Sequence, residues 1–70
     1  MTVGQRIKQL RLFKLGWSRD ALTIALGKRN NKCVADWEHD NTHPNFKTYH
    51  KLLEIFDITD EEFMKGVDLE

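Results

Sequence analysis

Apolar residues recur along this chain at the three- and four-residue spacing of amphipathic helices. A first helix is predicted around Ile7, Leu10 and Phe13, with basic and amide side chains between them, and Gly16 ends it. A later stripe predicts another helix, with its inner face at Phe46, Tyr49, Leu52, Leu53 and Phe56. No segment alternates with the period of two that is typical of a half-buried strand, so we expect an all-α fold.

Two short helices are predicted between these stripes. Ser18 is a natural N-cap for a helix that runs to Leu26, and Gly27 is a typical C-terminal stop. A polar turn over residues 28–31 follows, in which an asparagine can cap a third helix from about Asn31 to Glu38. Residues 40–45, with the only proline, are predicted to form a loop.

Residues 59–62, Thr-Asp-Glu-Glu, form a capping-box pattern that predicts a short fifth helix burying Phe63. The sequence therefore predicts a compact bundle of about five short helices. Seventy residues form a single domain, with its core expected over about residues 3–64. Leu69 and Glu70 are consistent with the remnant of a C-terminal affinity tag and carry no weight.

The composition excludes several classes of function. There is no apolar run of about 20 residues, no signal-peptide stretch and only one cysteine, so we expect a cytoplasmic protein without membrane contact. No catalytic motif or Gly-rich phosphate loop is present, so no enzyme activity, cofactor or small-molecule substrate is expected. Cys33, His39 and His43 have too few ligands at suitable spacing for a structural zinc site. Trp17 and Trp37 fall where the helical pattern turns inward and are predicted to belong to the core.

The second and third predicted helices, with the turn that begins at Gly27, form a helix-turn-helix pattern. Residues 16–22, Gly-Trp-Ser-Arg-Asp-Ala-Leu, followed by Leu26-Gly27, resemble the opening of lambda-repressor-like (Cro/XRE-type) domains, which typically read Gly-Leu-Ser-Gln-Glu-Glu-Leu-Ala and then Leu-Gly. Trp37-Glu38, Pro44, Leu52 and Ile58-Thr59 resemble the Trp-Glu-x-Gly-x-x-x-Pro segment and the helix after it. The resemblance implies a small phage Cro-like regulator of transcription that acts in a genetic switch.

The chain departs from this pattern at four places. The stretch from Gly27 to Trp37 is one residue longer than usual, which leaves the register of the third helix open by one residue. Arg19 replaces the usual Gln, Thr23 replaces a small Ala, and Asp40 stands where the pattern has Gly. Asp adopts the left-handed backbone conformation less readily than Gly but more readily than most residues.

Carried over by position, the resemblance implies two sets of contacts with a double-stranded DNA operator. The base-reading residues would be Asn31, Lys32, Ala35 and Asp36, which suit adenine, guanine, the thymine methyl group and cytosine respectively. The phosphate-contacting residues would be Arg19, Lys28, Arg29, His39, Asn41 and Thr42. Such domains usually bind paired half-sites, so a weak homodimer is also expected.

Charge is distributed unevenly along the chain although the net charge is zero. Up to Cys33 there are eight basic residues and one acid, whereas from Val34 there are three lysines and ten acids. Such asymmetry is a hint of nucleic-acid contact. A dedicated DNA-binding domain is usually basic overall, however, and this chain is not.

A second class of function therefore stays open. Asp36, Glu38 and Asp40 lie on or just after the helix that should approach phosphates, and they fit a basic protein surface better. Leu12 and Ile24 occupy positions that the family usually fills with polar residues, and exposed apolar side chains that cluster mark protein interfaces. These five residues predict an alternative interface, with which a modulator or anti-repressor would bind a cognate repressor and mask its DNA-binding surface.

Overall fold

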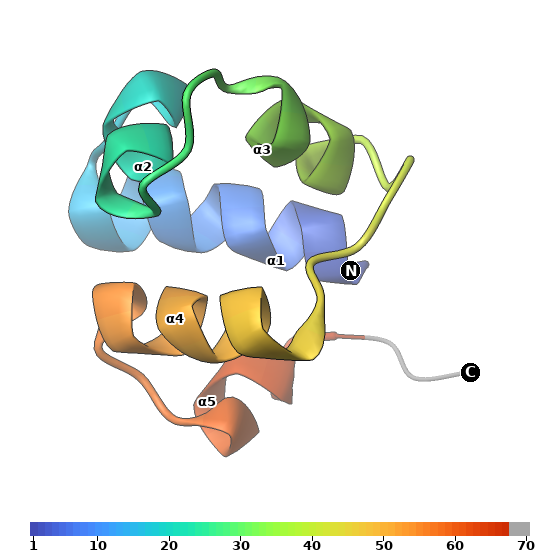
Figure 1. Cartoon of the computed structure of the whole chain (residues 1–70). Helices are drawn as coiled ribbons and strands as arrows, with labels where there is room; N and C mark the ends of the chain where they lie inside the picture. Colours follow the sequence, from blue (N-terminus) through green and yellow to red (C-terminus); the bar gives the residue numbers. More distant parts are fainter. Residues whose placement is uncertain (68–70) are drawn as a thin grey trace.

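The computed structural model describes residues 1–67, and these residues form helices and connections without a strand. Helix α1 (Val3–Gln9) runs directly into a wider π-helical segment, η1 (Leu10–Leu15), so that the two form one continuous helix (Figure 1). The remaining helices are α2 (Arg19–Ala25), α3 (Lys32–Glu38), α4 (Phe46–Phe56) and α5 (Asp60–Met64). The all-α prediction with five short helices is confirmed, while Leu69 and Glu70 lie outside the described residues.

The helix ends lie where the capping residues predicted them. The Ser18 hydroxyl accepts a hydrogen bond from the Ala21 backbone amide at 3.1 Å, which satisfies one of the free N–H groups at the start of α2. Gly16 and Gly27 adopt left-handed φ values of 66° and 75°, which end η1 and α2. The Thr59 hydroxyl accepts from the Glu62 amide at 3.1 Å and caps α5.

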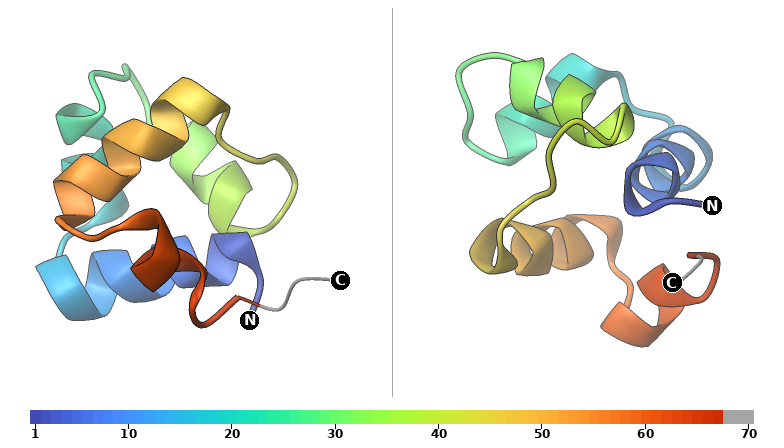
Figure 2. Two further views of the ribbon diagram at one scale, coloured as in Figure 1. Left: turned by 90° about the horizontal axis from the view of Figure 1, so that it is seen from below. Right: turned by 90° about the vertical axis from the view of Figure 1, so that its right-hand side faces the viewer.

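The helices are arranged in two pairs around one core. Helices α2 and α3 form one end of the molecule, α4 and α5 form the opposite end, and α1 lies beside both pairs (Figures 1 and 2). The buried apolar residues come from every helix and from the end of α2, and they are Ile7, Leu10, Leu22, Leu26, Val34, Trp37, Leu52, Leu53, Phe56 and Phe63. Burial of Trp37 confirms its predicted core position, whereas Trp17 is half-buried at the edge of the core. None of the helices within residues 1–67 is long and apolar enough to cross a membrane.

Two aromatic residues that the periodicity placed on inner helix faces are exposed instead. Phe13 is 83% exposed because the π-helical geometry of η1, with its i to i+5 bonding, changes which residues follow Leu10 on the inner face. Arg11 is buried in this segment, and Leu15, five residues after Leu10, packs against the core. Phe46, the first residue of α4, is 78% exposed and packs edge-on against His50.

Helices α1 and α3 approach closely at Gly4, a buried glycine in α1. A Cβ atom at this position would lie 1.9 Å from the Trp37 carbonyl oxygen and 2.6 Å from a carboxylate oxygen of Asp40. Backbone cannot yield as a flexible side chain can, so only glycine allows this contact. The close approach places the carboxyl end of α3 against the first turn of α1.

We expect Gly4→Ala to destabilise the protein by about 2 kcal/mol or more, because it overpacks a contact made by backbone. The measurement is the free energy of unfolding from chemical denaturation followed by far-UV circular dichroism. Gly66→Ala is the matched control, since a Cβ there meets nothing within 4 Å. Equal stability of the two variants would contradict the close packing of α1 against α3.

Candidate nucleic-acid interface

The structure settles the register of α3. Val34, Trp37 and Glu38 are buried and share the inner face of the helix. On the other side, Asn31 and Lys32 are exposed and Ala35 and Asp36 are partly exposed. The four residues predicted to read bases therefore lie together on the accessible side of α3, on the end of the molecule formed by α2 and α3 (Figure 1).

Two asparagines organise the start of α3 in different ways. The side-chain oxygen of Asn30 accepts from the Lys32 backbone amide at 3.0 Å in the turn before α3, whereas Asn31, at the N-cap position, makes no side-chain capping bond, so the predicted asparagine cap is not formed. The Asn31 side-chain amide donates to a carboxylate oxygen of Asp20 in the first turn of α2 at 2.8 Å. This bond uses one of two amide protons and leaves the other proton and the amide oxygen for a bidentate contact. Asp20, which was not predicted to belong to the site, thus orients a predicted base-reading residue.

Glu38 lies at the centre of a buried ionic cluster. Its side chain is only 1% exposed, and its carboxylate accepts hydrogen bonds from Arg11 Nε at 2.7 Å and Arg11 Nη2 at 3.1 Å. Arg19 Nε donates to the same carboxylate at 3.0 Å. Arg11 also donates from Nη1 to the Trp17 carbonyl oxygen at 2.7 Å. One carboxylate therefore links η1, the first residue of α2 and the last residue of α3.

The arginines control the ionisation of Glu38. Burial alone would raise the pKa of this carboxyl group. The hydrogen bonds from Arg11 and Arg19 and the positive charges of the two guanidinium groups outweigh burial, so the pKa of Glu38 lies below its usual value of 4.5. Glu38 is thus a structural anion at neutral pH.

These contacts contradict one predicted protein-interface residue, Glu38, and give a second, Asp40, an internal role. The prediction that Glu38 faces a partner is wrong, because Glu38 is buried and bound to Arg11 and Arg19. Asp40 is exposed, but its carboxylate accepts from Thr2 Oγ1 at 2.7 Å and from the Gly4 amide at 3.2 Å. Its φ of 60° shows that it adopts the left-handed conformation expected where the family pattern has glycine. Asp40 therefore joins the end of α3 to the start of α1.

The predicted phosphate-contacting residues form two groups. Lys28 and Arg29 are exposed in the turn between α2 and α3, and His39, Asn41 and Thr42 are exposed directly after α3. Arg19 is different, because its Nε is engaged by Glu38 while its side chain remains 34% exposed. A guanidinium held in this way keeps its terminal nitrogen donors in a fixed orientation. The first group therefore lies before α3 and the second after it.

Two of the predicted protein-interface residues are exposed as expected, Ile24 at 76% and Leu12 at 43%. Phe13, which the periodicity placed in the core, adds a third exposed apolar side chain near Leu12. A shallow depression of about 220 Å³ beside α1 is lined by both Leu12 and Phe13.

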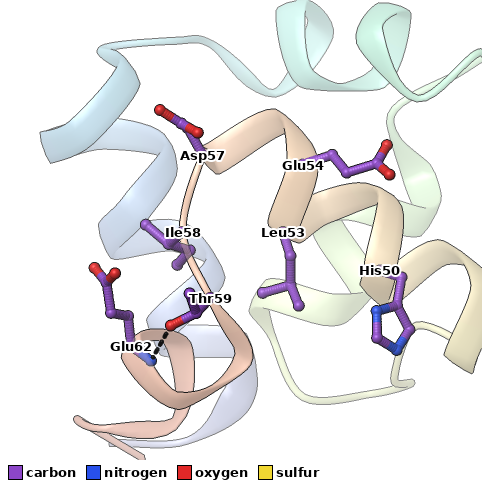
Figure 3. Close-up of a pocket in the computed structure, with 7 residues that line it drawn as sticks. All are labelled: His50, Leu53, Glu54, Asp57, Ile58, Thr59 and Glu62. Carbon is purple, nitrogen blue, oxygen red and sulfur yellow. Dashed lines mark hydrogen bonds between the residues drawn. The ribbon is translucent and has the colours of Figure 1, made fainter.

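An acidic depression lies away from α3, between α4 and the start of α5 (Figure 3). It encloses about 340 Å³ and is lined by His50, Leu53, Glu54, Asp57, Ile58, Thr59 and Glu62. Figure 3 shows that the three carboxylates point in different directions rather than toward one another. The arrangement offers no paired acid and base. Among residues 1–67, no three potential ligands from His, Cys, Asp and Glu come together as a metal site.

Comparison of the sequence with known protein families gives no match, and comparison with curated protein sequences gives none either. The function proposed for the α2–α3 unit therefore depends on its geometry and on the sequence resemblance.

We expect Glu38→Gln to lower the free energy of unfolding by about 3 kcal/mol or more at pH 7, because it leaves two buried or partly buried guanidinium groups without a counter-charge. Since the pKa of Glu38 is lowered by folding, its contribution to stability is complete above about pH 4.5 and is lost as the pH falls through the lower folded-state pKa. The difference between wild type and variant should therefore shrink on acidification, measured by denaturant unfolding from pH 7 to pH 3. Glu54→Gln, at an exposed position on α4, is the control and should change stability little.

Proposed function

We propose that this protein is a sequence-specific DNA-binding regulator of the Cro/repressor type, which inserts α3 into the major groove. The observation that carries the proposal is the two-sided character of α3. One side, with Val34, Trp37 and Glu38, is fixed to the core, and the other presents the predicted base-reading side chains beside the cations of the turn. This is what a recognition helix needs, because base discrimination requires polar groups held in a fixed position.

Electrostatics support DNA over a basic protein surface as the partner. In the sequence, three acids on or just after α3 counted against a DNA-binding role. In the structure, two arginines neutralise Glu38, and the carboxylate of Asp40 accepts hydrogen bonds from Thr2 and Gly4 at the start of α1. The Arg11–Glu38–Arg19 cluster carries a net charge of +1. Of these acids only Asp36 remains on the accessible side of α3, where a carboxylate suits cytosine N4.

The individual roles follow from the side chains and their environments. Lys32, exposed at the start of α3, would donate to guanine O6 and N7, and Asn31, oriented by Asp20, would bind adenine. Arg19, Lys28 and Arg29 would contact phosphates and set the position of the domain on the duplex.

The size of the molecule is compatible with paired binding. Its longest dimension is 32 Å, and half-sites on one face of DNA lie about 34 Å apart. Two copies would therefore fit side by side on an operator with two-fold symmetry.

The test of this function is titration of the protein against labelled duplexes from around its own gene, at several salt concentrations. Selective binding well below the non-specific range of roughly 10⁻⁴–10⁻⁶ M, with a steep salt dependence, would support it. Binding that never exceeds the non-specific level on any of these duplexes would contradict it.

We expect Lys32→Ala and Arg29→Gln to affect DNA binding differently. Lys32→Ala removes a base-reading group, so it should lower the affinity by about 1–3 kcal/mol and alter the base preference at one position of the site. Arg29→Gln removes a phosphate contact, so it should weaken binding to all sequences and reduce the salt slope by about 0.9. Binding curves with a panel of single-base variants distinguish the two. An equal loss on every sequence for Lys32→Ala would remove its assignment as a base reader.

The exposure of Ile24 favours a second candidate function, that of an anti-repressor which binds a cognate repressor. An apolar side chain that is 76% exposed on a helix surface is typical of a protein contact when other apolar residues accompany it. In this case the protein would release a repressor encoded nearby from its operator, and Ile24→Ser should abolish the release without changing stability. Gel-shift displacement with that repressor is the measurement. Unchanged displacement by Ile24→Ser would exclude α2 as the contact surface.

A further inference from the structure

A basic groove lies between the end of α2 and the first turns of α4. It encloses about 270 Å³ and is lined by Leu26, Lys28, Asn45, Lys47, Thr48 and Lys51. The lining contains three lysines and no carboxylate among the residues that the structure describes. Of these lysines, the family resemblance implied a DNA contact for Lys28 alone, while Lys47 and Lys51 lie outside the helix-turn-helix.

One of these cations is held in place. Lys51 donates from Nζ to the Leu26 carbonyl oxygen at 3.2 Å, at the carboxyl end of α2. This bond offsets the partial negative charge that a helix carries at its carboxyl end. An ammonium group has three donors, so Lys51 keeps two for another acceptor. The carboxyl end of α2 would otherwise repel an anion. Lys51 places a positive charge there, on the side of the groove formed by α2.

The other two lysines extend the charge along the groove. Lys47 precedes Lys51 by four residues and therefore lies on the same face of α4. Lys28 approaches from the opposite side, on the turn that leads into α3. The carboxylates of Glu54 in α4 and of Asp57 at its C-cap line the separate acidic depression instead (Figure 3).

We propose that this basic groove binds the DNA phosphate backbone next to the major groove that α3 enters. The inference rests on the proposed function and extends its contacts from the α2–α3 unit to α4. Lys28 belongs both to the turn beside α3 and to the groove, so a single strand can run from one to the other. An open channel with cations on both sides matches a chain of phosphates, and Asn45 and Thr48 in its lining are residue types that contact sugar and phosphate oxygens.

The experiment compares the double variant Lys47→Gln, Lys51→Gln with wild type on the selected duplex and on random DNA, since both lysines belong to the groove and neither belongs to the α2–α3 unit. Both lysines are exposed, so the substitutions should leave the fold intact, which circular dichroism verifies. Loss of two phosphate contacts should reduce the salt slope by about 1.8 and weaken binding about fivefold or more at moderate salt, by the same factor on both duplexes. Lys65→Gln, an exposed lysine beside the acidic residues of α5, is the matched control and should retain the wild-type slope.

Three outcomes overturn the inference, and the first two differ in what they say about the proposed function. If wild type binds selectively and the double variant keeps its affinity and salt slope, the groove does not contact DNA, while the function of α3 stands. If wild type binds no duplex selectively, the proposed function fails and the groove proposal fails with it. A loss confined to the selected duplex would also overturn the inference, because backbone contacts carry no base preference.

Discussion

The buried carboxylate of Glu38 is the interaction on which the candidate recognition surface depends. Transfer of this charge out of water is costly, and three hydrogen bonds from Arg11 and Arg19 offset that cost. Because these partners come from η1 and from the first residue of α2, the cluster fixes α3 relative to both. Asp40 adds a second attachment, from the residues after α3 to the start of α1. The contacts of Glu38 and Asp40 with η1, α2 and the start of α1 thus fix the position of the accessible face of α3.

Helix ends and the core were predictable because they depend on local chemistry. Ser18, Gly16 and Gly27 act within one turn of their own positions, and the core residues of α4 follow from simple periodicity. Phe13 was placed wrongly because the pattern assumes uniform α-helical geometry, whereas η1 is π-helical. A π-helical segment has no clear signature in a single sequence.

The candidate site could be predicted only in part, because it depends on contacts between distant residues as well as on the register of one helix. The exposed residues of α3 could be assigned from the resemblance, since their positions depend only on the helix register. The role of Glu38 could not, because an acid in a helix looks the same in sequence whether it faces solvent or a pair of arginines 19 and 27 residues away. The Asp20–Asn31 contact and the basic groove likewise bring together residues that are distant in sequence.

The uneven charge along the chain has two physical origins. Part of it is internal, since Arg11 and Arg19 bind Glu38, and Arg6 donates to the carbonyl oxygens of Glu62 and Phe63 at 2.8 and 2.9 Å. The remainder is on the surface, with the cations of the turn and groove at one place and the acids of α4 and α5 at another. A neutral protein of this kind can still orient itself toward a polyanion, because its surface charges are separated rather than mixed.

The double attachment between α2 and α3 has a mechanical consequence. Arg19 joins α2 to Glu38 at the end of α3, and Asp20 joins α2 to Asn31 at its beginning, so the two helices are tied at both ends of α3. A unit tied in this way has little freedom to adjust its tilt. On binding a duplex, any misfit in groove width or bend would have to be relieved by deformation of the DNA. Sequences that deform easily would then be preferred even at base pairs that no side chain touches.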